Sequence, residues 1–241
     1  AQIIFAQEAS VDPKTEAQKY INAELKVLTV DEALAGARDI IAEWVNEDAQ
    51  ARARLRELYL EHGRFETHVI KGKEEAGAKF KDYFQWSDPV KTAPSHRVLA
   101  MRRGEKEEFL ALRVLVDEAA ALNILSEMFI KGKGACVSQV QMAIEDSFKR
   151  LLSLSMETEI RLITKQRADE EAIKVFAENL RQLLMASPLG QKSVLAVDPG
   201  FRTGCKVVAL NAQGKLLHQT VIYISHSDDQ KEQAAAAIKK I

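Results

Sequence analysis

The stretch Ser187-Pro-Leu-Gly-Gln-Lys-Ser-Val-Leu-Ala-Val-Asp-Pro-Gly200 decides the fold. Proline and glycine near its start interrupt a long helical pattern, because neither residue readily continues a helix. The uninterrupted apolar run from Val194 to Val197 that follows is typical of a strand covered on both faces. We therefore expect a domain boundary here, with a helical region over residues 1–187 and an α/β segment over residues 188–241.

The residues after this first strand have the pattern of a hairpin followed by a helix. Residues 205–210 and 215–224 are rich in the β-branched and apolar residues that favour strands. Between them, Asn211-Ala-Gln-Gly214 has the composition of a tight turn, in which glycine supplies a positive φ. An aspartate at position 228 or 229 then begins a helix. Strand, hairpin and helix together predict a small α/β fold.

Helical start and stop signals dominate before the boundary. Asp12 precedes Pro13, which places an N-cap before a proline at the first helical position. Thr29 and Glu32 have the spacing of a capping box. Gly63 follows an apolar helical pattern and predicts that a helix ends just before it. The region before residue 187 is therefore expected to be mainly α.

The middle of the chain is less clearly patterned. Residues 64–85 are mixed, and Ser95 is expected to cap a short helix. Residues 108–116 fit either a short strand or a helix. The longest predicted helix covers residues 156–186, and it would extend about 45 Å at roughly 1.5 Å per residue. A helix of this length often braces one module against another.

Composition limits the classes of function. The chain has 34 Lys and Arg against 35 Asp and Glu, a net charge of −1, so nucleic acid or anionic lipid would need a local basic patch. Cys136 and Cys205 lack metal-ligand spacing and cannot form a disulfide framework, which favours the reducing cytoplasm. No apolar run approaches the roughly 18–20 residues that span a bilayer. We expect no metal site, no membrane segment and, because the chain begins at Ala1 and ends in a helical pattern, a longer parent protein.

The stretch Asp198-Pro-Gly-Phe-Arg-Thr-Gly204 is the most specific chemical signal. A buried strand delivers the Asp198 carboxylate at its end, and the Pro-Gly turn reverses the chain at once. In the ribonuclease H-like superfamily, nucleases and resolvases place such an aspartate on Mg²⁺ in a two-metal site. Sugar kinases and ATPases use the same turn to approach nucleotide phosphates. The remaining interpretation is that Asp198 only caps the turn, since a two-metal site needs several carboxylates.

Two basic clusters are candidates for contact with a phosphate backbone. The first consists of Arg97, Arg102, Arg103 and Lys106. Glutamates interleaved with these residues favour an ordinary salt-bridged surface instead. The second is the glycine-rich loop that contains Lys131 and Lys133, whose amides and cations could cradle a phosphate. It lacks the Walker spacing and its terminal Ser or Thr, so a solvated helix end fits it better.

Four stretches in this order resemble the Tex family of bacterial transcription accessory proteins. They are Ala33–Glu43, Pro94–Ala100 with Arg103–Glu105, Phe176–Arg181, and Asp198–Val207. The resemblance covers nearly the whole chain. It implies a mainly α, multi-helix central region followed by the start of a YqgF domain of ribonuclease H-like fold. In Tex-like proteins, helix-hairpin-helix modules and an oligonucleotide-binding barrel follow.

The resemblance implies a nucleic-acid-binding role in transcription, with RNA or DNA and the transcription machinery as partners. We expect a non-enzymatic scaffold without a cofactor, because Tex-like proteins are regarded as lacking demonstrated nuclease activity. One alternative is a Mg²⁺-dependent nuclease or resolvase in which Asp198 is catalytic, and another is a phosphate-binding ATPase or kinase-like fold. The expected nucleic-acid contacts are Arg97, Arg102, Arg103, Lys131, Lys133 and Arg202.

Overall fold

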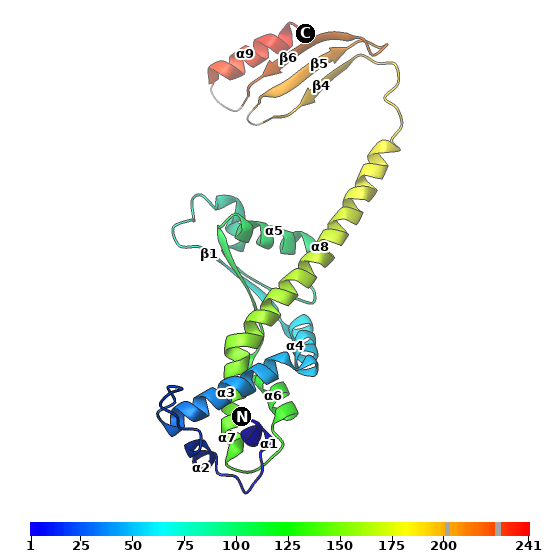
Figure 1. Cartoon of the computed structure of the whole chain (residues 1–241). Coiled ribbons are helices and arrows are strands. Elements are labelled where there is room, and N and C mark those ends of the chain that lie inside the picture. Colours follow the sequence, from blue (N-terminus) through cyan, green and yellow to red (C-terminus); the bar gives the residue numbers. More distant parts are fainter. Residues whose placement is uncertain (201–202, 225–227) are drawn as a thin grey trace. The chain divides into compact units, whose positions relative to one another are not determined.

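The computed structural model describes residues 1–200, 203–224 and 228–241, which form the compact units Ala1–Ala177 and Glu178–Ile241 (Figure 1). The helices before α8 are α1 (Gln2–Ala6), α2 (Pro13–Gln18), α3 (Val30–Glu47), α4 (Ala49–His62), η1 (Ala78–Tyr83), α5 (Ser95–Lys106), α6 (Glu118–Phe129), α7 (Cys136–Asp146) and η2 (Ser147–Leu152). The remaining elements are α8 (Ser153–Leu184), α9 (Asp228–Lys239), β1 (Arg64–Val69), β2 (Gln85–Pro89), β3 (Leu110–Leu115), β4 (Val194–Asp198), β5 (Cys205–Leu210) and β6 (Leu216–Ile222). None of the helices in the described ranges is both long and apolar enough to cross a membrane.

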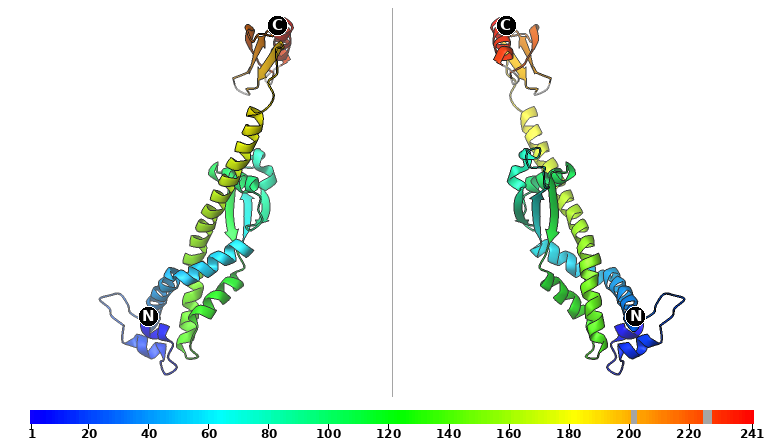
Figure 2. Two further views of the ribbon diagram at one scale, coloured as in Figure 1. Left: turned by 90° about the vertical axis from the view of Figure 1, so that its right-hand side faces the viewer. Right: turned by 90° about the vertical axis from the view of Figure 1, so that its left-hand side faces the viewer.

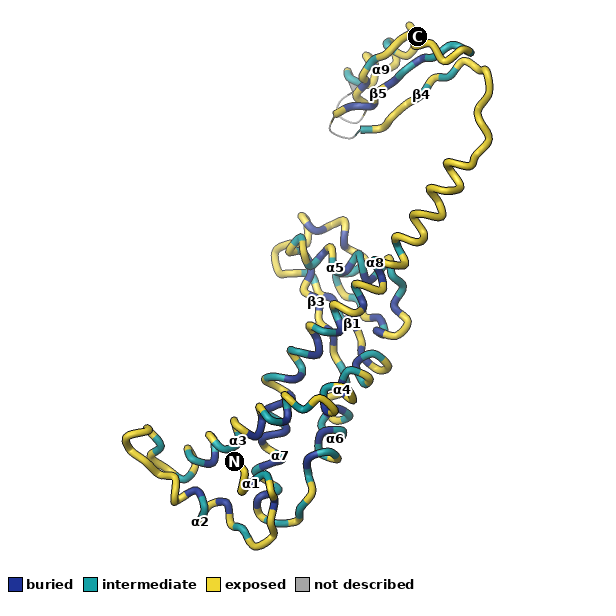
Figure 3. The backbone as a smooth tube through the Cα atoms, turned by 45° about the vertical axis from the view of Figure 1, so that its right-hand side comes forward, coloured by how far each residue is buried: buried dark blue, intermediate teal, exposed yellow. Residues whose placement is uncertain are grey.

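A helical bundle built on α3 and α7 contains much of the core of the first unit. Ile41 and Val45 of α3 and Val140 and Ile144 of α7 are completely buried. Burying a side chain of this size contributes roughly 1.5–3 kcal/mol relative to leaving it exposed. Figure 3 shows buried residues concentrated where these helices approach one another. The mainly α fold class that the sequence predicts is confirmed.

The expected helix boundaries in this bundle are confirmed by their caps. The Thr29 hydroxyl accepts a hydrogen bond from the Glu32 amide at 3.2 Å, and the Glu32 carboxylate accepts one from the Thr29 amide at 3.1 Å. The Asp12 carboxylate accepts from the amides of the first turn of α2. Helix α4 ends at His62, directly before Gly63. The sequence predicts these caps correctly because the two partners in each cap lie within a few residues of each other along the chain.

A three-stranded antiparallel sheet, in the order β2-β1-β3, interrupts the region that we expected to be helical. Phe65 of β1 is paired with Asp88 of β2 on one side and Val114 of β3 on the other. Burial alternates strictly along β3, as expected of a strand with one buried face. Of the two possibilities for residues 108–116, the strand is correct. The region before residue 187 is mainly α, as predicted, but β1 and β2 are strands that the sequence did not predict.

The long helix α8 continues from α7 through the π-helical segment η2. The Ser147 hydroxyl at this junction donates to the Ala42 carbonyl oxygen at 2.7 Å, which ties the junction to α3. Helix α8 begins three residues before the predicted start and ends at Leu184, before the predicted break at Ser187. The two views of Figure 2 place α5 and the sheet beside the middle of α8. One face of α8 therefore packs against α5 and the sheet.

The second unit contains a separate antiparallel sheet, in the order β4-β5-β6, and helix α9. The turn between β5 and β6 is as predicted: the Asn211 side chain accepts from the Lys215 amide at 2.9 Å, and Gly214 has φ of +78°. Helix α9 covers the buried Val207 and Ile222. The change from helix to strand that the sequence predicts after residue 187 is confirmed. The boundary between the compact units lies earlier, after Ala177 within α8, whereas the change of secondary structure follows Leu184.

Candidate nucleic-acid interface

Helix α5 is held against α8 by polar contacts from both of its ends. The Ser95 hydroxyl contacts the Glu171 carboxylate, and the Glu105 carboxylate is paired with Arg161. Arg167 also donates to the carbonyl oxygen of Val90, just before α5, at 3.1 Å. Ser95 is therefore not the N-cap that the sequence predicts, because Pro94 occupies that position and the serine side chain reaches α8 instead.

A glycine allows α5 to lie directly on the sheet. A Cβ atom on Gly104 would be 2.5 Å from Cδ1 and 2.8 Å from Cγ of Leu110. Leu110 begins β3 and is almost completely buried, so its side chain has little room to move. Val98 and Met101 are buried on the same helix. This close approach fixes the position from which the basic residues of α5 project.

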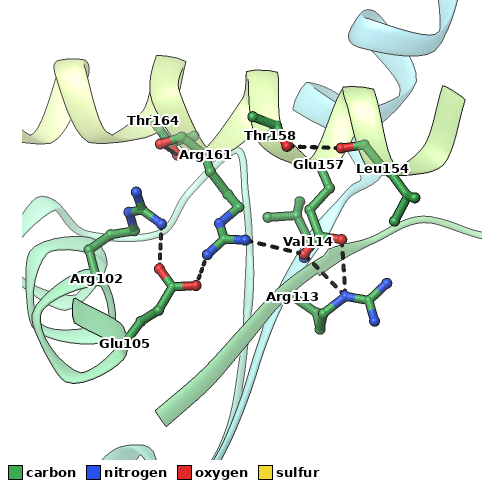
Figure 4. A network of polar contacts seen from close by, with 9 residues as sticks. All are labelled: Arg102, Glu105, Arg113, Val114, Leu154, Glu157, Thr158, Arg161 and Thr164. Atoms are coloured by element: carbon green, nitrogen blue, oxygen red, sulfur yellow. Dashed lines mark hydrogen bonds and ion pairs between the residues drawn. The ribbon is translucent and has the colours of Figure 1, made fainter. Parts of the chain in front are cut away.

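An ion-pair network beneath α5 joins it to α8 and β3 (Figure 4). Glu157 is only 6% exposed, and its carboxylate accepts from the Arg113 guanidinium at 3.0 and 3.1 Å. Arg161 lies 3.7 Å from Glu157 and also pairs with Glu105, which in turn pairs with Arg102. Burial lowers the pKa of the Arg161 guanidinium, and the nearby charge of Arg102 adds to this effect. The network holds α5 in a fixed register on α8.

A groove of about 670 Å³, which we call the α5–α8 groove, lies along this contact. Its lining residues come from three elements that are distant in sequence. Helix η1 contributes Lys79, Phe80 and Tyr83; α5 contributes His96, Leu99, Ala100, Arg102, Arg103 and Lys106; and α8 contributes Lys165 and Asp169. The lining thus contains five lysine and arginine side chains and one carboxylate, that of Asp169. Such a concentration of positive charge is attractive to a phosphate backbone.

Most of these cations already have a carboxylate partner. Glu107, outside the groove lining, pairs with both Lys79 and Arg103, the latter at 3.3 Å. Lys165 pairs with Asp169. Lys106 makes no ion pair with any described residue, and the Arg103 side chain is 75% exposed despite its partner. Exposed ion pairs contribute only about 0–1 kcal/mol, so a phosphate can compete for these side chains.

The α5 cluster that the sequence predicts is only partly brought together. Arg102 and Arg103 line the α5–α8 groove, but Arg97 does not. Arg97 instead pairs with Asp88 at 3.1 Å, and its guanidinium lies 5.2 Å from the centre of the Trp86 ring. All three arginines therefore have carboxylate partners, as a salt-bridged surface requires.

The second predicted cluster lies elsewhere in the first unit, in the loop after α6. The Gln7 side chain accepts hydrogen bonds from the amides of Lys131 and Gly132 at 3.0 and 3.1 Å. It also donates to the carbonyl oxygen of Phe129 at 2.6 Å. These two loop amides are therefore engaged within the protein, which weakens the case for a phosphate cradle. The Lys131 and Lys133 side chains are exposed.

The carboxylate that the sequence singles out lies in the second unit. Asp198 is exposed at the end of β4 and is paired in register with Lys206 of β5. In the described part of the chain, no group of three or more His, Cys, Asp or Glu residues is arranged to hold a metal ion. Arg202, the remaining predicted contact, lies outside the described residues.

The groove residues that η1 and α8 contribute are absent from the sequence predictions. Lys79 and Tyr83 lie in the mixed segment before β2, and Lys165 lies on the long helix. No local pattern marks them, because they meet the α5 cluster only through tertiary packing. Lys106 was part of the basic cluster in the sequence and is confirmed as a neighbour of Arg103.

Comparisons with known proteins agree with this architecture. A family model described as Tex central region-like matches residues 8–176, and one described as Tex protein YqgF-like domain matches residues 192–241. The YdcI protein of Bacillus subtilis is 37% identical over 227 residues, which cover 93% of this chain and 32% of YdcI. Protein tex of Bordetella pertussis is 35% identical over 92% of this chain and 30% of its own length. Transcriptional accessory protein Tex of Neisseria gonorrhoeae is 33% identical over the whole chain and 32% of its own length.

The chain therefore spans about a third of the length of these curated relatives. The match to the central-region model covers well over half of the chain, and the YqgF-like match covers most of the remainder. The positions of both matches agree with the order of the helical region and the second sheet. This chain belongs to the Tex family.

Proposed function

We propose that this chain is a nucleic-acid-binding, non-catalytic scaffold segment of a transcription accessory protein, and that it contacts phosphates through the α5–α8 groove. The observation that carries the proposal is the convergence of five lysine and arginine side chains from η1, α5 and α8 on one groove. The name of the Neisseria gonorrhoeae relative supports the link to transcription. RNA and DNA are both candidate ligands, and the transcription machinery is the proposed protein partner.

Binding through this groove is expected to be weak and sensitive to salt. The net charge of −1 supplies no general attraction, so affinity rests on a few local contacts. Arg103 and Lys106 are the main candidates because both are exposed and Lys106 has no ion-pair partner in the described part of the chain. Non-specific affinities of this kind are on the order of 10⁻⁴ to 10⁻⁶ M at physiological salt.

A charge-neutralisation experiment tests the location of binding. Arg103→Gln with Lys106→Gln should weaken binding of a fluorescein-labelled oligonucleotide severalfold in fluorescence anisotropy. Lys131→Gln with Lys133→Gln removes the same charge from the other predicted cluster and should leave the affinity nearly unchanged. Equal losses in the two variants would show that binding depends on overall charge, and the proposal for the groove would then be wrong.

The non-catalytic part of the proposal has a separate test. A two-metal nuclease needs several converging carboxylates, and Asp198 is the only candidate that the sequence singles out. Incubation of a labelled single strand with the chain and Mg²⁺ should leave the strand intact. Cleavage that requires Mg²⁺ and disappears in Asp198→Ala would instead support the nuclease alternative.

A further inference from the structure

The α5–α8 groove contains apolar side chains as well as cations. Phe80 is almost completely buried, and Tyr83, Leu99 and Ala100 are half-buried, so these four residues form its floor. Lys79, Arg103, Lys106 and Lys165 are more exposed to solvent than Arg102, and Arg103 is the most exposed of the cations in ion pairs. A ligand that matches both features must present a flat apolar group beside an anionic one.

Tyr83 adds a polar function to this floor. Its ring packs edge-on against Trp86, with ring centroids 6.1 Å apart, so the ring is held in place. Among the described residues, the Tyr83 hydroxyl has no hydrogen-bond partner. The pKa of Tyr83 is raised, mainly by burial, so the hydroxyl is protonated at neutral pH. The group can donate or accept a hydrogen bond at the edge of a ligand.

We propose that the α5–α8 groove binds an unpaired nucleotide of a single-stranded nucleic acid, with its base on the floor of Tyr83 and Leu99 and its phosphates on Arg103 and Lys106. This inference rests on the proposed function and specifies its ligand. The groove volume of about 670 Å³ lies within the range of roughly 300–1,000 Å³ that is typical of small-molecule sites.

A duplex fits these features less well than a single strand. In a duplex the base faces are stacked inside, and the phosphates and sugars supply most of the contacts. A duplex lying on the groove would reach Arg103 and Lys106 but would leave the apolar floor without a partner. Unpaired bases, in contrast, stack on aromatic and apolar side chains while cations follow the backbone. An acidic peptide shares the anionic character of the ligand but has no flat base.

The test compares three DNA probes of one sequence, using the 241-residue chain and fluorescence anisotropy. The probes are the single strand, the same strand annealed to its complement, and a strand of abasic nucleotides with the same number of phosphates. We expect the single strand to bind roughly tenfold more tightly than either of the others, which is within the range for one stacked base. Equal affinities for all three probes would overturn the unpaired-base inference while leaving phosphate binding intact.

Protein variants provide a second and independent measurement. Tyr83→Ala should weaken binding of the single strand to the level of the abasic strand, whereas Tyr83→Phe keeps the ring and should retain most of the preference. If Tyr83→Ala unfolds, the comparison of probes with the wild-type chain still decides the matter. An acidic peptide that displaces the single strand as efficiently as unlabelled DNA does would contradict the inference. Affinity for all probes that is unaffected by Arg103→Gln with Lys106→Gln would contradict the proposed function itself.

Discussion

The guanidinium Nε of Arg113 in β3 donates to both carboxylate oxygens of Glu157 in α8, at 3.1 and 3.0 Å. The same carboxylate also accepts from the backbone amide of Val114 at 3.1 Å. One buried side chain on α8 therefore accepts hydrogen bonds from both the backbone and a side chain of strand β3, in the sheet β2-β1-β3. Through Arg161 and Glu105 the contact extends to α5, which supplies most of the α5–α8 groove.

Removing this carboxylate should destabilise the first unit. Glu157→Ala leaves the Val114 amide without its acceptor and leaves the half-buried Arg161 with Glu105 as its remaining partner. We expect a loss of about 1–3 kcal/mol in the free energy of unfolding, because the buried Val114 amide is left without a hydrogen bond. Urea denaturation followed by circular dichroism measures this change.

Glu159 provides the matched control for Glu157. It lies on the same helix, pairs with Arg52 and Arg56, and is partly exposed. Glu159→Ala should cost less than about 1 kcal/mol, since solvent replaces most of what the pairs contribute. Equal losses for the two variants would show that Glu157 has no special structural role.

The close approach of α5 to β3 predicts opposite effects for two glycine substitutions. Gly104→Ala places a methyl group against Leu110, and overpacking of this kind costs about 1–3 kcal/mol. Gly36 lies within α3, and a Cβ at that position meets no atom within 4 Å. Gly36→Ala should therefore stabilise the chain by up to about 1 kcal/mol through helix propensity. Thermal unfolding compares the two, and a stabilising Gly104→Ala would contradict the packing described for α5.

The edge strand β4 predicts self-association of the chain. Leu195 and Val197 are each 51% exposed. They are paired with Ala209 and Val207 of β5, so they lie on the face of the sheet that α9 covers only in part. An exposed apolar edge strand is prone to pair with another chain. Sedimentation velocity should show association that increases with concentration and decreases in Leu195→Lys with Val197→Lys.

A control for this prediction uses two exposed leucines of α8. Leu154 and Leu162 are as exposed as the β4 residues but do not lie on a sheet edge. Leu154→Lys with Leu162→Lys should leave the association unchanged. A wild-type chain that remains monomeric over the whole concentration range would show that the β4 edge does not drive association.

Local sequence signals predicted the elements whose partners are close in sequence. The capping box of Thr29 and Glu32 and the turn at Asn211 were both correct, since each is complete within a few residues. Strand β1 was missed because its six residues are stabilised by β2 and β3, which lie 16 or more residues away along the chain. Ser95 was assigned to a cap, but the hydroxyl binds Glu171, a partner that no local pattern reveals.

The sequence predicted only the part of the candidate site that lies on a single helix. Arg102, Arg103 and Lys106 are close together in the sequence, and their clustering on one helix could be foreseen. Lys79 and Lys165 join them only because η1 and α8 pack close to α5 in the folded chain. Charge composition alone does not reveal such a groove, since a chain with a net charge of −1 can still concentrate cations on one surface.

The salt dependence of binding tests the central claim, that phosphates bind in the α5–α8 groove, most directly. For a single strand, each phosphate contact contributes about −0.7 to the slope of log K against log salt concentration. Arg103→Gln with Lys106→Gln should therefore reduce the magnitude of the slope by about 1.4, while Lys131→Gln with Lys133→Gln should leave it unchanged. A slope that is the same in the wild-type chain and in the Arg103 and Lys106 variant would contradict phosphate binding in this groove.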